Sequence, residues 1–207
     1  LEYMWSFFDG SIFERVQKRF QQAFKIPTLA GDAHLEANSL GGSLELDGTG
    51  DWLALGVGET IDLSFIANSF TVSVWAEVFV SGAAEQQFFS PDANNSSIRV
   101  FQFRKDADDT IRFARFDSAD ALLANFSGGA FPIGRGNPGT AVARFDSAVG
   151  SEIFINGESV ATNGVTTANN SESCPIAIGA RTRAIDYSSV QEPLTGCIYD
   201  VRLYNRP

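Results

Sequence analysis

The chain has 207 residues and a formal net charge of −10. An acidic surface repels phosphate backbones, so we do not expect nucleic acid as a partner. No apolar run approaches the ~20 residues of a membrane-spanning helix, so we expect no membrane span. Hydrophobic residues make up 44 % of the sequence, including 18 phenylalanines, which is enough for a sizeable core.

The first 42 residues differ in pattern from the rest. Ser11 and Glu14 have the spacing of a helix capping box, and Pro27 ends the pattern that follows. Apolar residues recur every fourth position between them, at Ile12, Val16, Phe20 and Phe24. Residues 32–42 are rich in Gly, Asn and Ser and predict a linker. The sequence therefore predicts an N-terminal arm with an amphipathic helix, plus a linker, over residues 1–42.

An aromatic cluster begins upstream of this helix pattern, and two interpretations stay open. The aromatics could fold back over the following domain. Alternatively they could anchor the chain in a partner, because an exposed apolar cluster is costly in a free monomer. Under the second interpretation, residues 1–27 dock a protein partner or sister copies. The proposed docking residues are Trp5, Phe7, Phe8, Phe13 and Phe20.

From residue 43 onward the apolar residues alternate with polar ones, which predicts strands. The clearest case runs from Phe70 to Val80. Ile98–Arg104 and Ile111–Asp117 flank a polar turn and predict a β-hairpin. Asn156-Gly157 predicts a type I′ turn in another hairpin. We expect about twelve strands in total.

Five short motifs occur in an order that resembles a known family. They are Leu44–Trp52, Ser69–Trp75, Ile155–Gly157, Ile176–Gly179 and Gly196–Asn205. Together they resemble the laminin G-like, concanavalin A-like lectin/glucanase domains of the pentraxin-like superfamily. The resemblance implies an all-β, antiparallel, two-sheet jelly-roll sandwich over residues 43–207, with its first and last strands side by side.

The last strand contains one irregular step. Ile198 and Val201 are three residues apart, whereas alternation would require two or four. If both side chains point into the core, a β-bulge should lie between them.

Catalytic residues are sparse. Glycoside hydrolases of this superfamily carry a Glu-x-Asp-x-x-Glu strand, and the nearest trace here is Glu45-Leu46-Asp47 with Gly at position 50. The only histidine is His34, in the predicted linker, so a histidine base for a nucleophile is also missing. We therefore do not expect an enzyme.

The resemblance implies calcium as a possible cofactor, held by carboxylates at the rim of the sandwich. The candidate ligands are Asp106, Asp108 and Asp109, in the turn of the predicted hairpin. The alternative is that these aspartates form a solvated hairpin tip.

A glycan is the other possible ligand. Glycan sites combine a flat aromatic ring with polar side chains, and long loops at the end of a sandwich are where binding residues gather. The candidates in two such loops are Phe131, Arg135, Asn137, Arg181, Arg183 and Tyr187. The alternative for the aromatic residues is burial in the core. Two interpretations also remain for Cys174 and Cys197, which could form a disulfide or stay as two buried thiols.

These observations predict a non-catalytic binding or structural module. We expect it to be displayed on a larger assembly, such as a virus, phage or cell surface, docked through the arm and possibly contacting glycans. The expected location is extracellular or on a virion surface. A stand-alone, calcium-assisted lectin is the alternative, and a glycoside hydrolase ranks below both.

Overall fold

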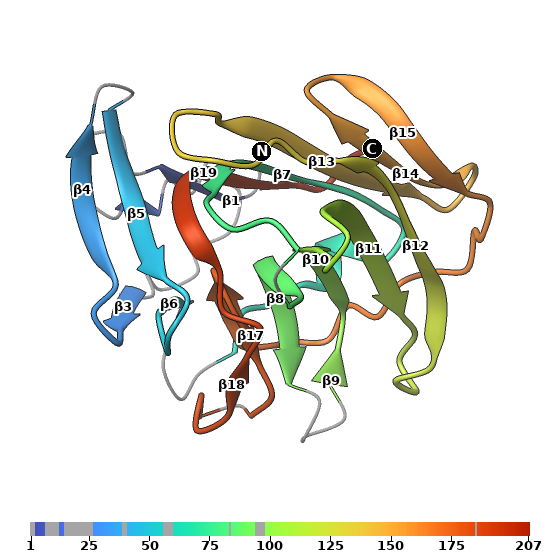
Figure 1. The fold of residues 1–207 in the computed structure, drawn as a ribbon. Coiled ribbons are helices and arrows are strands. Elements are labelled where there is room, and N and C mark those ends of the chain that lie inside the picture. The colour runs from blue at the N-terminus through green and yellow to red at the C-terminus, as the bar shows by residue number, and fades with distance from the viewer. Residues whose placement is uncertain are drawn as a thin grey trace.

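The computed structural model describes residues 3–6, 13–14, 27–38, 41–55, 60–82, 84–93, 98–184 and 186–207. Within these residues the protein is an antiparallel β-sandwich of two large sheets, here called sheet A and sheet B (Figure 1). Its one helical element in the described residues is the short 3₁₀ turn η1 (Ser64–Ile66). None of the described helices is long and apolar enough to cross a membrane.

Sheet A contains nine strands in the described part of the chain. Its spatial order is β15 (Glu158–Asn163), β14 (Gly150–Ile155), β13 (Gly139–Asp146), β7 (Ser69–Val78), β19 (Thr195–Tyr204), β1 (Tyr3–Ser6) and β2 (Phe13–Glu14). Two more strands, β5 (Gly41–Asp47) and β4 (His34–Asn38), extend the sheet from β19.

Sheet B contains eight strands in the same residues. Its spatial order is β12 (Leu122–Ala130), β11 (Thr110–Phe116), β10 (Phe101–Lys105), β8 (Gln86–Ala93), β16 (Ile176–Ile178), β6 (Trp52–Leu55) and β3 (Pro27–Ala30), with β9 (Ile98–Arg99) paired to β8. A separate two-stranded hairpin, β17 (Arg181–Thr182) and β18 (Val190–Gln191), lies against β8.

The core lies between the sheets and is rich in phenylalanine. Phe70 of β7 stacks on Phe101 of β10 with ring centroids 4.9 Å apart, which joins the two sheets directly. Phe113 of β11 meets both rings edge-on or tilted, at 5.9 and 5.8 Å. These aromatic pairs form because alternate residues of each strand point inward, as the period-two pattern predicted.

The jelly-roll fold predicted from the motifs is confirmed. β5 and β19 are hydrogen-bonded neighbours, so the opening and closing strands lie side by side. The register of β19 against β7 shifts between Ile198 and Asp200, and both Ile198 and Val201 are fully buried. The expected bulge is therefore present. Asn156 and Gly157 have φ angles of 52° and 86°, as a type I′ turn requires.

The N-terminal segment differs from the predicted arm wherever it is described. Phe13–Glu14 is strand β2 rather than helix, and β1 pairs with β19 of the same chain. At Phe13–Glu14 the local helix pattern yields to backbone pairing with β1, which is itself held in the sheet by β19. The other positions of the predicted helix, 11–12 and 15–24, lie outside the described residues, as do Phe7, Phe8 and Phe20.

The predicted linker is also corrected. His34–Asn38 forms β4, which pairs with β5 across its full length, and β3 joins sheet B upstream of it. The Gly- and Asn-rich composition of residues 32–42 predicted a linker, but the segment contains a short strand whose alternation places Leu35 against the core. The division of the chain at residue 43 into an arm and a domain stays a prediction.

Candidate functional site

The outer face of sheet B carries a charged network at its centre. On β10, Phe101 and Phe103 point into the core, so Gln102 and Arg104 point outward. Arg112 of β11 is the cross-strand partner of Arg104. These outward side chains are polar, yet Gln102 and Arg104 are buried. A buried charge is stable only when it is paired, so Arg104 requires acidic partners on the same face of the sheet.

Asp106 holds the two arginines together. Its Oδ1 accepts from Arg104 Nε at 3.1 Å and its Oδ2 accepts from Arg112 Nε at 2.5 Å. Like charges directly opposite each other on neighbouring strands repel, and one carboxylate between them removes that cost. Arg112 also donates through Nη1 to Asn125 Oδ1 of β12 at 3.4 Å.

Asp92 of β8 is the most deeply buried acid of the network. Its side chain is 0 % exposed, and its Oδ2 accepts from Gln102 Nε2 at 2.5 Å and from Arg181 Nε at 2.9 Å. Its Oδ1 has no hydrogen-bond partner among the described residues. Burial raises the pKa of Asp92, and the nearby Arg181 opposes that rise. The carboxylate is therefore held in a costly state.

Two glutamates close the network. Glu192 accepts from Gln87 Nε2 at 2.5 Å and lies 3.5 Å from Arg104 Nη1. Glu85 accepts from Arg104 Nη2 at 2.7 Å. Burial raises the pKa of Glu85, while Arg104 lowers it. We call the set made of Glu85, Gln87, Asp92, Gln102, Arg104, Asp106, Arg112, Arg181 and Glu192 the sheet B network.

The hairpin β17–β18 covers part of this face. In Figure 1 it lies near β8, and contacts join β17 to both β8 and β16. Tyr187, between its strands, packs on Ala54 and Ala177, and its hydroxyl donates to the Ile176 carbonyl at 2.9 Å. Two members of the network stay accessible, because the side chain of Arg112 on β11 is 31 % exposed and that of Glu85, just before β8, is 41 % exposed. A ligand could reach the network there.

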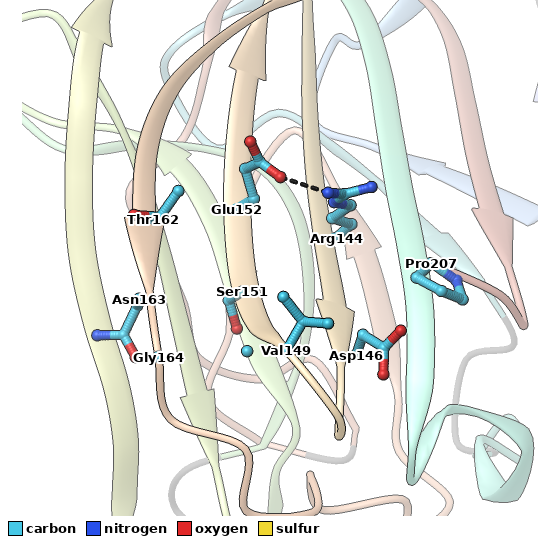
Figure 2. Close-up of a pocket in the computed structure, with 10 residues that line it drawn as sticks. Arg144, Asp146, Val149, Ser151, Glu152, Thr162, Asn163, Gly164 and Pro207 are labelled. Atoms are coloured by element: carbon cyan, nitrogen blue, oxygen red, sulfur yellow. Dashed lines mark hydrogen bonds and ion pairs between the residues drawn. The ribbon is translucent and has the colours of Figure 1, made fainter.

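A second surface feature lies on sheet A. A pocket of about 380 Å³ opens where β13, β14 and β15 meet the last residue, Pro207. Figure 2 shows Arg144 and Glu152 pointing toward each other, and Arg144 Nη2 donates to Glu152 Oε2 at 2.6 Å. Val149, 72 % exposed, adds an apolar rim. Two of the three charged side chains that line the pocket are thus paired with each other, and Asp146 is the third.

A family profile decides the relationship of the chain. The profile of the concanavalin A-like lectin/glucanases superfamily matches residues 47–207, which is most of the sequence. The chain belongs to this superfamily. No curated protein sequence matches it significantly.

Solved structures show the same superfamily fold at low sequence identity. The binding domain of botulinum neurotoxin serotype G is 11 % identical, with a TM-score of 0.67, over 99 % of this chain and 47 % of that chain. This chain therefore spans about half the length of that domain. Domain 4 of AbnA, an extracellular arabinanase of Geobacillus stearothermophilus solved with arabinotriose, is 15 % identical with a TM-score of 0.65 over 98 % and 91 %.

A third solved structure, of a smaller domain, also has a similar fold. The CBM40 domain of the Ruminococcus gnavus IT-sialidase, bound to α2,6 sialyllactose, is 16 % identical with a TM-score of 0.52. The alignment covers 73 % of this chain and 89 % of that one. At these sequence identities the likeness shows the fold alone. It does not identify a ligand of this chain.

The predicted calcium ligands do not gather. Asp106 lies between two arginines, Asp109 accepts from Lys105 Nζ at 2.7 Å, and Asp108 accepts from Thr110 Oγ1 at 2.7 Å. Each carboxylate is engaged by a different neighbour, and their role as calcium ligands stays a prediction. One set of three carboxylates that does meet in the described residues is that of Asp32, Asp47 and Asp51, with one oxygen of each within 4.8 Å of the others.

The predicted glycan residues are scattered. Phe131 is 3 % exposed and packs on Phe88 in the core, and Tyr187 is buried beneath its hairpin, so neither ring faces solvent. Arg181 and Arg183 lie on or beside β17, and Arg181 belongs to the sheet B network. Arg135 and Asn137 are exposed in the loop after β12, where Arg135 stacks over Phe79 at 3.8 Å. The binding role of the accessible residues stays a prediction.

Apart from Asp106 and Arg181, which were predicted for other sites, the residues of the sheet B network were missed by sequence reasoning. One signal was available, since Gln102 and Arg104 alternate with Phe101 and Phe103 and so mark a polar outer face. The pairing of Asp92 with Arg181 spans 89 residues and leaves no local trace. The two cysteines are free and buried in the structure, which favours the thiol interpretation.

Proposed function

We propose that this chain is a non-catalytic glycan-binding module whose ligand contacts the accessible side of the sheet B network. The observation that carries the proposal is the arrangement of Arg104, Asp106 and Arg112. Two arginines on adjoining strands and Asp106, the residue that follows β10, are held in fixed geometry by ion pairs at 3.1 and 2.5 Å. A site whose side chains are already ordered loses little conformational entropy when a ligand binds.

The chemistry of this face suits carbohydrate. Guanidinium groups donate hydrogen bonds and carboxylates accept them, and here Arg104 of β10 and Arg112 of β11 lie beside the carboxylates of Asp106 and Glu85. A sugar hydroxyl does both, so neighbouring hydroxyls match a surface that offers donors and acceptors side by side. Arabinotriose and sialyllactose are the ligands named for two of the similar structures, which supports the same ligand class here.

A glycan array tests the proposal. The full chain should bind a defined set of glycans and release no cleaved product from them. Arg112→Gln should weaken binding about 10-fold or more, because a hydrogen bond to a charged group contributes about 1.5–3 kcal/mol. Arg202→Gln is the matched control and should bind normally. Its Nε pairs with Asp200 Oδ2 at the same 2.5 Å, but on the other sheet.

The outcomes separate the alternatives. Absence of any glycan signal, or equal binding by wild type and Arg112→Gln, contradicts the proposed site. Loss of binding in Val149→Asp, with Arg112→Gln unaffected, would move the site to the pocket on sheet A. Hydrolysis of a bound glycan would contradict the non-catalytic assignment.

Calcium assistance is a second proposal, favoured by the convergence of Asp32, Asp47 and Asp51. Oxygen ligands from carboxylates suit Ca²⁺. Repeating the array with calcium and with EDTA tests it: loss of signal in EDTA supports a calcium-assisted lectin, and equal signals contradict it. Asp47→Asn should reproduce the EDTA result, while Asp186→Asn, an exposed aspartate in another turn, should not.

Attachment to a larger assembly through residues 1–27, outside the cell or on a virion, is also proposed. β2 is the last described strand on its side of sheet A, and an edge strand offers backbone groups to a partner chain. Light scattering of the full chain tests self-association, and co-sedimentation with its native assembly tests docking. A clean monomer that stays in the supernatant contradicts this proposal.

A further inference from the structure

His34, Glu36 and Glu45 lie together on the outer face of β4 and β5, away from the sheet B network. His34 and Glu45 are direct cross-strand partners, and Glu36 follows His34 by two residues. Because side chains alternate along a strand, all three point to the same side, while Leu35 and Leu44 face the core. One nitrogen or oxygen of each residue lies within 4.8 Å of the other two.

The ring of His34 has an acceptor at both nitrogens. Nδ1 lies 3.0 Å from the Asp32 carbonyl oxygen, and Nε2 lies 3.0 Å from Glu36 Oε1. Neither of these oxygens can donate a hydrogen bond, and a neutral imidazole carries only one N–H. One of the two contacts therefore requires a positive charge beside the ring, supplied by a second proton or by a cation.

The backbone contact decides which nitrogen faces the carboxylates. If Nδ1–H donates to the Asp32 carbonyl, the lone pair of Nε2 is directed toward Glu36 and Glu45. Metal-binding histidines are commonly oriented in this way, with the second ring N–H held by a carbonyl or carboxylate. The donor set then consists of one imidazole nitrogen and two carboxylates, all on short, paired strands.

Glu45 already has one partner. Its Oε1 accepts from Arg135 Nη2 at 3.2 Å, and the Arg135 side chain is 70 % exposed. An ion that binds through the other carboxylate oxygen does not need to displace this arginine. The His34 and Glu36 side chains are about half exposed, so an ion can enter from solvent.

We propose that His34, Glu36 and Glu45 form a binding site for a divalent transition metal, with Zn²⁺ as the best match. Zinc accepts imidazole and carboxylate ligands together, whereas calcium prefers oxygen ligands alone. Three protein ligands leave the fourth tetrahedral position for water. This site is independent of the proposed glycan function.

Zinc titration of the full, metal-free chain tests the proposal. Isothermal titration calorimetry with ZnCl₂ should show one saturable site, and Co²⁺ should give a visible absorption band typical of nitrogen and oxygen ligation. His34→Ala and Glu36→Gln should each weaken zinc binding at least about tenfold, since even the loss of outer-shell partners costs that much. Glu152→Gln, a partly buried strand glutamate that pairs with Arg144 on another part of sheet A, is the control and should bind normally.

Two results would overturn the proposal. One is zinc binding of equal strength by wild type and His34→Ala, which would assign the ion to other acidic groups. The other is absence of zinc binding together with a doubly protonated His34 ring in the NMR spectrum, which would assign the positive charge to a proton. All three side chains lie on the surface, so circular dichroism should show folded variants throughout.

Discussion

Asp92 shows how a single buried carboxylate can reduce the stability of the folded protein. The carboxylate is buried on the outer face of sheet B, and Gln102 and Arg181 satisfy only one of its oxygens. Burial raises its pKa despite the nearby Arg181 and Arg99. The ionised carboxylate is thus less stable in the folded protein than in water. The folded state therefore binds the proton of Asp92 more tightly than the unfolded state does.

This asymmetry predicts the pH dependence of stability. The contribution of Asp92 should be fully present below its ordinary pKa of 3.8 and lost as pH rises through its raised pKa in the folded state. The difference in unfolding free energy between wild type and Asp92→Asn should therefore grow in favour of wild type as pH falls from ~7 to ~4. Denaturant unfolding at several pH values measures it.

Asp186→Asn provides the control of opposite sign. Hydrogen bonds from Ser188 lower the pKa of Asp186, so its stabilising contribution should be present near neutral pH and lost in acid. A wild-type minus Asp92→Asn difference that is flat, or that falls in acid as for Asp186, would contradict the account of Asp92.

At the scale of elements, the strands divide by length. The ten residues of β7 alternate clearly, and their prediction as a strand is confirmed. β17 and β18 have two residues each, which is too short to show any periodicity. Their hairpin is placed by contacts that Tyr187 and Val190 make with Ala54 and Ala177. Sequence patterns therefore identify long elements and miss those that tertiary contacts hold in place.

The close approach of β19 to β7 yields a second prediction. A Cβ atom at Gly196 would lie 2.1 Å from the Glu77 carbonyl oxygen, which is backbone and cannot move aside easily. Gly196→Ala should lower the free energy of unfolding by about 1–3 kcal/mol or more. Gly164→Ala, where a Cβ meets no atom within 4 Å, should change it by less than about 0.5 kcal/mol. Thermal or urea unfolding compares the two, and equal stability would contradict the packing.

On the scale of the whole molecule, the reactivity of the two thiols depends on whether the sandwich is folded. Cys197 lies on β19 of sheet A, and Cys174 precedes β16 of sheet B. Both are buried. Burial raises the pKa of Cys197 to about 11 and that of Cys174 well above its ordinary value. Since the thiolate is the reactive form, both cysteines should be inert while the sandwich stays closed.

Thiol titration tests this third prediction. The native chain should react slowly with Ellman's reagent at pH ~8, near the ordinary cysteine pKa. In denaturant without reductant, two thiols per chain should react at once. Fewer thiols under denaturing conditions would indicate a disulfide, and rapid labelling of the native chain would contradict the burial of both side chains.

The sequence by itself determined the fold class, the long strands, the Asn156-Gly157 turn and the bulge in the last strand. Each follows from local rules: the two-residue period of a strand, the positive φ of a type I′ turn, and the burial of both Ile198 and Val201. Predictions failed where local propensity competed with strand pairing in sheet A, as at Phe13–Glu14, which pairs with β1, and at His34–Asn38, which pairs with β5.

Only the tertiary structure decided which residues meet. It placed Phe131 in the core, paired β1 with β19, and joined Asp92 to Arg181 and Gln87 to Glu192, partners 89 and 105 residues apart. It also separated the aspartates of one turn and brought His34, Glu36 and Glu45 to one surface. The physical reason is that charge pairing and metal ligation depend on strand order and register, and no local period in a sequence records these.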